Sequence, residues 1–145
     1  MADCVLDASV VAFSNGDLTA RRRGNVFDRR LRAIEQVIAG VHRLRFNGRL
    51  LGEYQNLIHE YRNDVIELLF ALLDSSRAVL VRRNNLSRQD YAIAVRRCGW
   101  PSHDQHLLAA ALGGIDSLIV VTEVRLFQCA AQILRSFDVH VERVA

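Results

Sequence analysis

Lysine is absent from this chain of 145 residues, and all 19 of its basic side chains are arginine. The absence excludes mechanisms that need a positioned lysine, such as Schiff-base catalysis and the ATPases with a lysine in their phosphate-binding loop. Codon bias is the simplest explanation of the composition. Arginine is also the better bidentate partner of phosphate, so an arginine-rich surface suits a nucleic acid.

Paired cysteines and long apolar stretches are missing as well. Cys4, Cys98 and Cys129 are odd in number and lie far apart in apolar runs. This pattern favours reduced thiols in a cytoplasmic protein over disulfides or a zinc site. The first residues lack the basic segment of a secretory signal, and the most apolar helix candidate, Val65 to Leu73, is too short to span a bilayer. We therefore expect a cytoplasmic protein with no membrane partner.

What remains is an alternation of short apolar runs with amphipathic segments. Strands are expected over residues 4–6, 41–46, 78–81, 117–122 and 139–144, and helices over residues 27–40, 50–61, 64–73, 87–98, 102–112 and 127–134. Strands that alternate with helices predict a mainly parallel sheet covered on both faces, a three-layer α/β/α sandwich. The length, with 50% hydrophobic and 24% charged residues, indicates one domain over residues 1–145.

Three acidic residues stand where such a fold places a ligand site. Asp7 ends the first strand, Glu53 flanks a helical stripe, and Asp104 lies in the first turn of a helix that Ser102 and Gln105 are expected to start as a capping box. Two ionised carboxylates ~5 Å apart repel by roughly 3 kcal/mol at an effective dielectric of 20. Each acid alone is better explained as a cap or surface carboxylate, but together they favour a site for a hard cation, Mg²⁺ or Mn²⁺.

The same acids and their neighbours resemble a known family, the PIN-domain ribonucleases, which include the VapC-type toxins. The matching motifs follow one another in order: Val5-Leu6-Asp7-Ala8-Ser9, then Glu53, then Asp104-Gln-His-Leu-Leu-Ala-Ala-Ala-Leu, and finally Asp116-Ser-Leu-Ile-Val-Val-Thr122 with Phe127 behind it. The resemblance covers nearly the whole chain. It implies a PIN-like sandwich and an endoribonuclease that cleaves RNA phosphodiester bonds with a water activated by Mg²⁺ or Mn²⁺.

The resemblance also implies roles for residues and partners. It makes Asp7, Glu53 and Asp104 the catalytic, metal-binding acids, and Ser9 and Thr122 hydroxyls that line the substrate site. It further implies a homodimer and, in toxin systems, a small antitoxin protein as partner.

Two features depart from the family. A further acid commonly lies two residues after the threonine, where this chain has Val124, and Glu123 is the metal ligand that a shift by one residue would supply. The missing acid favours an alternative function, a catalytically weakened PIN-like domain that binds nucleic acid or protein. The segment between Asn15 and Asn25 is long for the family. Its three arginines are candidate phosphate contacts, for which a solvated cluster is an equal alternative: Arg21, Arg22 and Arg23.

Other chemistries find less support. Cys98, His103 and His106 lack the fourth ligand of a structural zinc site. A phosphoacceptor receiver domain also has an aspartate at a strand end, but it grips the phosphoryl group with a lysine that this chain does not have. Ser9 has no histidine at a spacing that indicates a serine hydrolase.

Overall fold

Five parallel strands form one sheet at the centre of the computed structural model, which describes residues 1–15, 25–60 and 64–144. The strands stand in the order β3-β2-β1-β4-β5. Cys4 of β1 pairs with Leu44 of β2 on one side and with Leu118 of β4 on the other. The strand bounds are Ala2–Leu6 (β1), His42–Asn47 (β2), Ala78–Val81 (β3), Leu118–Val121 (β4) and His140–Arg143 (β5).

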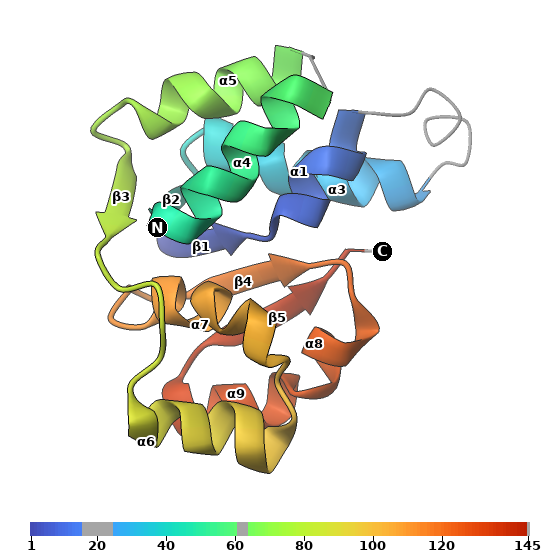
Figure 1. Ribbon diagram of the computed structural model, residues 1–145. Coiled ribbons are helices and arrows are strands. Elements are labelled where there is room, and N and C mark those ends of the chain that lie inside the picture. Colours follow the sequence, from blue (N-terminus) through green and yellow to red (C-terminus); the bar gives the residue numbers. More distant parts are fainter. Residues whose placement is uncertain (16–24, 61–63, 145) are drawn as a thin grey trace.

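Helices cover both faces of the sheet, so the predicted three-layer α/β/α fold in a single domain is confirmed (Figure 1). One layer holds α1 (Ala8–Asn15), α3 (Asn25–Ile38), α4 (Gly48–Glu60) and α5 (Asp64–Leu73). The other layer holds α6 (Arg88–Tyr91), the π-helix η1 (Ala92–Cys98), the 3₁₀ helix η2 (Ser102–Asp104), α7 (Gln105–Ala111), α8 (Val124–Gln128) and α9 (Ala130–Phe137).

The core lies where the three middle strands meet these two layers. Val5, Leu44 and Ile119 are completely buried, which is why their strands read as continuous apolar runs rather than alternating ones. The outer strands are less covered: Leu80 of the edge strand β3 is exposed. Within the described ranges, no helix has the length and apolar character needed to cross a membrane.

Two local predictions were wrong. No helix was predicted between residues 6 and 27, but α1 starts directly after Asp7 and continues to Asn15. The predicted capping box does not form, because Gln105 Oε1 accepts a hydrogen bond from the Leu86 amide at 3.0 Å instead of reaching back to Ser102. The tight 3₁₀ turn η2 therefore precedes α7, which begins one turn later than predicted.

Candidate functional site

The strand order places a ligand crevice at the carboxyl ends of β1 and β4. The chain leaves β1 toward β2 on one side and later returns to β4 on the other side of β1. In open α/β sheets, the point where the strand order reverses opens a crevice outside the strand ends. Asp7 directly follows β1, and Thr122 and Glu123 directly follow β4, so all three lie at this point.

A chain of hydroxyl groups joins the two strand ends. Thr122 Oγ1 donates to Ser9 Oγ at 2.8 Å, and Ser9 Oγ donates to Asp7 Oδ2 at 2.8 Å. The Asp7 amide also donates to the carbonyl oxygen of Val120 at 3.0 Å. The structure thus brings Ser9 and Thr122 into one polar network with Asp7 and holds the Asp7 carboxylate in a defined orientation.

The helix α4 contributes Glu53 from the side of the crevice. Its side chain is one-third exposed, and its Oε1 lies 3.1 Å from Nε2 of His106 and 3.9 Å from Nε of Arg49. The contact with Arg49 is an exposed pair one helical turn apart, which contributes little energy. The Glu53 carboxylate thus lies near the side-chain nitrogens of His106 and Arg49 and is still accessible to solvent.

The turn before α7 contributes Asp104. Its side chain is 15% exposed, and its Oδ2 is buried without a hydrogen-bond partner, although His103 Nε2 lies 3.3 Å away. The carbonyl oxygen of Asp104 accepts a hydrogen bond from Trp100 Nε1 at 2.9 Å, which fixes the backbone of this turn. A buried carboxylate oxygen with no donor is costly and indicates a place for a positive group.

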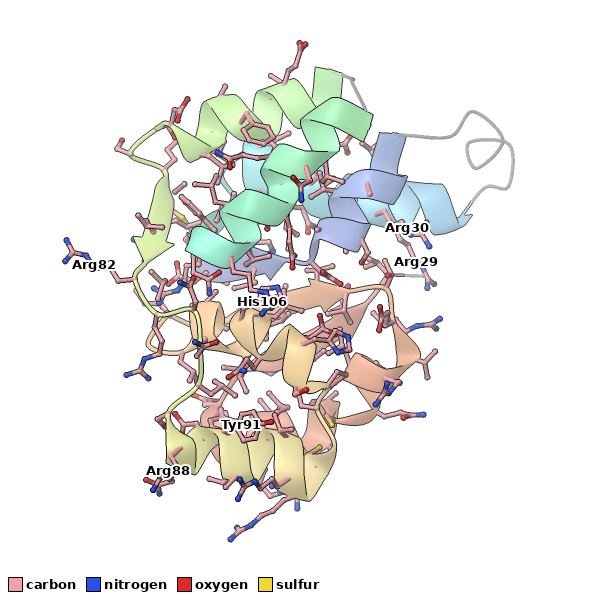
Figure 2. The ribbon with its side chains drawn as sticks, viewed as in Figure 1. Arg29, Arg30, Arg82, Arg88, Tyr91 and His106 are labelled. Carbon is pink, nitrogen blue, oxygen red and sulfur yellow. The ribbon has the colours of Figure 1, made fainter. Side chains whose placement is uncertain are left out.

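Sequence reasoning missed the part that His106 plays here. Its side chain is 1% exposed, and Figure 2 shows it in the middle of the molecule, between the two helical layers. Asn47 Nδ2 donates to the His106 carbonyl oxygen at 2.9 Å and thereby ties the first turn of α7 to the end of β2. The available signal was spacing, because His106 precedes the buried Ala110 by four residues and shares its helix face.

The four acids repel one another. Burial raises the pKa of Asp7, the hydrogen bond from Ser9 opposes this, and the charges of Asp104, Glu53 and Glu123 raise it further, to about 6. Burial likewise raises the pKa of Asp104, where His103 and His106 oppose the repulsion by Glu123 and Glu53. The predicted acids therefore share one electrostatic environment, at which a bound cation would be stabilised.

Glu123 takes part although it follows β4 by two residues. It occupies the N-terminal cap position of α8 and is exposed, and its charge acts on both Asp7 and Asp104. Val124, at the position of the expected acid, is 48% exposed. The candidate phosphate contacts Arg21, Arg22 and Arg23 lie outside the described residues.

The carboxylate oxygens of the four acids are the ligand type that a hard cation prefers, but they do not form a complete coordination shell. In the described part of the chain, no three His, Cys, Asp or Glu side chains are arranged to hold one metal ion. Mg²⁺ usually keeps several of its waters and binds through one or two carboxylates, so it does not need such a cage. Of the four acids, Asp7 and Asp104 are the ones whose burial fits direct contact with a cation, since both side chains are largely buried and Asp104 Oδ2 lacks a donor.

Comparisons of the chain with models of protein families, with curated proteins and with solved structures find no match. The similarity to PIN-domain ribonucleases therefore rests on the motifs alone, and a function for this chain has to be inferred from its own residues.

Proposed function

We propose that this protein is a metal-dependent endoribonuclease. Its active site is the acidic cluster at the carboxyl ends of β1 and β4, which consists of Asp7, Glu53, Asp104 and Glu123. The observation that carries the proposal is geometric: the buried Asp7 lies at the end of β1 beside Asp104, whose Oδ2 is buried without a hydrogen-bond donor. The charges of Glu53 and Glu123 act on both carboxylates, in keeping with the raised pKa of Asp7. Burying like charges together is costly unless a cation neutralises them. Oxygen ligands of this kind favour Mg²⁺ or Mn²⁺.

The residues of the acidic cluster have different roles in this proposal. Asp7 and Asp104 would hold the ion, and the hydroxyls of Ser9 and Thr122 keep the Asp7 carboxylate in one orientation. Glu53 and Glu123 would reach the ion through water. When bound, the ion supplies positive charge that activates a water and offsets the charge of the phosphodiester transition state.

His106 positions Glu53 in this scheme. Its Nε2 lies 3.1 Å from the Glu53 carboxylate, and its side chain is almost completely buried, so the imidazole has little room to turn away. A fixed neighbour of this kind decides the direction in which a carboxylate points, and such neighbours commonly affect metal affinity by about 10- to 100-fold.

The toxin-like assignment adds expectations about the protein's surroundings. A VapC-type nuclease would act on RNA in the cytoplasm, form a homodimer and be restrained by a small antitoxin protein. Size-exclusion chromatography with light scattering tests the dimer, and growth arrest on expression, relieved by a neighbouring small gene, tests the toxin role.

Cleavage of RNA tests the proposed activity directly. A single-stranded RNA incubated with the protein should be cut in Mg²⁺ or Mn²⁺ and left intact in EDTA. Asp7→Asn and Asp104→Asn should each lower the cleavage rate by at least about 100-fold. Asp74→Asn, an equal charge change at the exposed end of α5, serves as the control and should cleave normally. Cleavage by Asp7→Asn and Asp104→Asn at the parent rate would contradict the proposal.

One observation favours a second function, a nucleic-acid-binding module with little catalysis. The described residues hold no ready-made group of three metal ligands, and Val124 replaces the acid that the family commonly has. Such a module would bind RNA equally well with and without divalent metal, and it would cut none of it.

A further inference from the structure

A cleft of about 420 Å³ lies between α3 and the strand β5, outside the acidic cluster. Its floor is apolar and includes Leu118 and Val120 of β4. Its walls carry most of the polar groups: Arg29, Arg32 and Gln36 from α3, His42 from β2, and Glu142 and Arg143 from β5. A volume of this size is typical of sites for small molecules or for part of a polymer.

The cleft results from the way the chain winds around the sheet. The helices α4 and α5 pack over β2 and β3 on this face, whereas α8 and α9 pack against β5 on the opposite face. The side of β4 and β5 that faces α3 is therefore bordered rather than covered by a helix (Figure 1). Val120 pairs with Glu142 in the sheet, so both side chains point to this open side.

Positive charge gathers around the cleft. Arg29, Arg32 and Arg143 are exposed, and none of them forms an ion pair within the described part of the chain. Arg30 lies beside them, with its Nε donating to the Val144 carbonyl oxygen at 3.3 Å. Burial lowers the pKa of Arg30, and the charge of Arg143 lowers it further. Guanidinium groups that repel one another favour an anion as their shared partner.

The cleft adjoins the acidic cluster through one residue. Arg143 Nε donates to the carbonyl oxygen of Thr122 at 2.9 Å, and the Thr122 hydroxyl begins the hydrogen-bonded chain that reaches Asp7. Figure 2 shows Arg29 and Arg30 on the side of the molecule where the chain ends, beside β5. Arg143 thus links the wall of the cleft to the residue whose hydroxyl belongs to the polar network of Asp7.

We propose that this cleft binds the sugar–phosphate backbone of single-stranded RNA on one side of the bond that is cleaved. Arg29 and Arg32 of α3 bind phosphates, since guanidinium groups match phosphate oxygens in bidentate geometry, and the charge of Arg143 adds to the positive field at the rim. Glu142 repels a small anion, but its carboxylate accepts hydrogen bonds from a ribose hydroxyl, which favours RNA over inorganic phosphate. The inference rests on the proposed ribonuclease function, because that function explains why a phosphate polymer would lie next to the acids.

Two double variants with the same charge change test the proposal. Arg29→Gln with Arg32→Gln removes two charges from the cleft. Arg82→Gln with Arg88→Gln removes two exposed charges from the far side of the molecule, as Figure 2 shows. The affinity for a fluorescent single-stranded RNA is measured by anisotropy in EDTA at several salt concentrations, so that no cleavage interferes.

The cleft variant should bind this RNA about tenfold more weakly than the parent protein. Its plot of log affinity against log salt should be shallower by roughly 1.4, as expected for two lost phosphate contacts on a single strand. The control variant should stay within about twofold of the parent. Equal affinities of the two variants, or no RNA binding by the parent, would overturn the proposal.

Competitors identify the ligand. Unlabelled RNA should displace the probe, whereas inorganic phosphate and poly-glutamate at equal charge concentration should not. Displacement by poly-glutamate as effective as by RNA would overturn the proposal in favour of an acidic protein segment.

Failure of the ribonuclease function would give a different result. The cleft variant would still bind RNA more weakly than the parent protein, but the parent protein would cut no RNA in any metal.

Discussion

Asp7 is 8% exposed, and its carboxylate lies among three other acids. Burial withdraws the charged form from water, and the neighbouring charges add to that cost. Because its pKa rises to about 6 from the ordinary 3.8, folding makes this carboxyl group harder to ionise. Without a cation, the native state therefore binds more protons than the unfolded chain between these two values.

The stability of the metal-free protein should fall as the pH rises through this window. The loss from Asp7 is complete above its folded pKa and amounts to at most about 3 kcal/mol. Asp7→Asn removes that loss. The free energy of unfolding of the variant minus that of the parent protein should therefore be more positive at pH 7.5 than at pH 4. Urea unfolding in EDTA at the two pH values measures the difference, and Asp74→Asn should leave it unchanged. An Asp7→Asn effect that is the same at both pH values would contradict this account.

Two glycines offer a second test of a local environment. A Cβ atom at Gly114 would meet Ser117 Oγ, and it would lie 2.9 Å from Asp3 Oδ2 and 3.0 Å from Arg45 Cδ. Gly114→Ala should therefore destabilise the protein by about 1–3 kcal/mol. At Gly52 in α4, a Cβ atom would meet nothing within 4 Å, so Gly52→Ala should stabilise the helix by up to about 1 kcal/mol. Urea unfolding should show opposite signs, and a neutral Gly114→Ala would contradict the packing described.

Some of the site's residues could be predicted individually and others could not. Asp7 and Asp104 were indicated by their places at a strand end and a helix start, which the fold brings to one edge. No sequence pattern indicated that His106 and Asp3 would be almost completely buried. Periodicity shows which face of an element points inward. It does not show which polar side chains the fold buries together with the apolar ones.

A second charged cluster at the opposite edge of the sheet ties elements together. Asp3 of β1 accepts hydrogen bonds from Arg43 Nε at 2.8 Å and from the Ile115 amide at 2.9 Å. The buried Arg45 lies 3.6 Å from Asp3 and donates to the carbonyl oxygens of Ala110 and Leu112 at the end of α7. A guanidinium at the C-terminus of a helix satisfies carbonyl groups that have no partner within the helix.

Removing the charge of Asp3 should weaken this connection. Burial opposes its ionisation, but the hydrogen bond from Arg43 and the further contacts outweigh burial and lower the pKa of Asp3. Its contribution to stability is thus present above pH 4 and is lost as the pH falls through the lowered pKa. Asp3→Asn should cost about 3 kcal/mol at pH 7 and less at pH 2–3.

The exposed Asp116 lies at the same edge, so Asp116→Asn is the matched control for this measurement. Thermal unfolding of both variants across pH 2–7 measures the effect. A penalty for Asp3→Asn that did not shrink in acid would show that the pairing with arginine is not its cause.

Whole elements were more predictable than their ends. Amphipathic stripes and apolar runs placed β3 and α5 correctly, because long periodic patterns reflect the face that each element buries. The helix α1 was missed, since the β-branched pair Val10 and Val11 prolongs the apolar run of β1. The start of α7 was misplaced because Gln105 bonds to Leu86, a contact between distant residues that no local rule contains.

At the scale of the whole molecule, the order of the strands produces two neighbouring regions of opposite charge, the acidic cluster and the arginine-lined cleft. The reversal of strand order beside β1 gathers acids from the end of β1, from α4, from η2 and from the end of β4. The open side of β5 leaves arginines of α3 uncovered next to them. The small formal net charge of +3 hides this division. Composition alone could not have revealed it, because it depends on which strands are neighbours.

The central claim is that the acidic cluster binds a divalent cation, and calorimetric titration with Mn²⁺ tests it most directly. At pH 6, near the folded pKa of Asp7, the parent protein should bind Mn²⁺ saturably and release protons. The proton release shows as a binding heat that changes with the ionisation enthalpy of the buffer. Asp7→Asn and Asp104→Asn should abolish saturable binding, while Asp74→Asn should not. No saturable binding by the parent protein, or equal binding by all variants, would contradict the account.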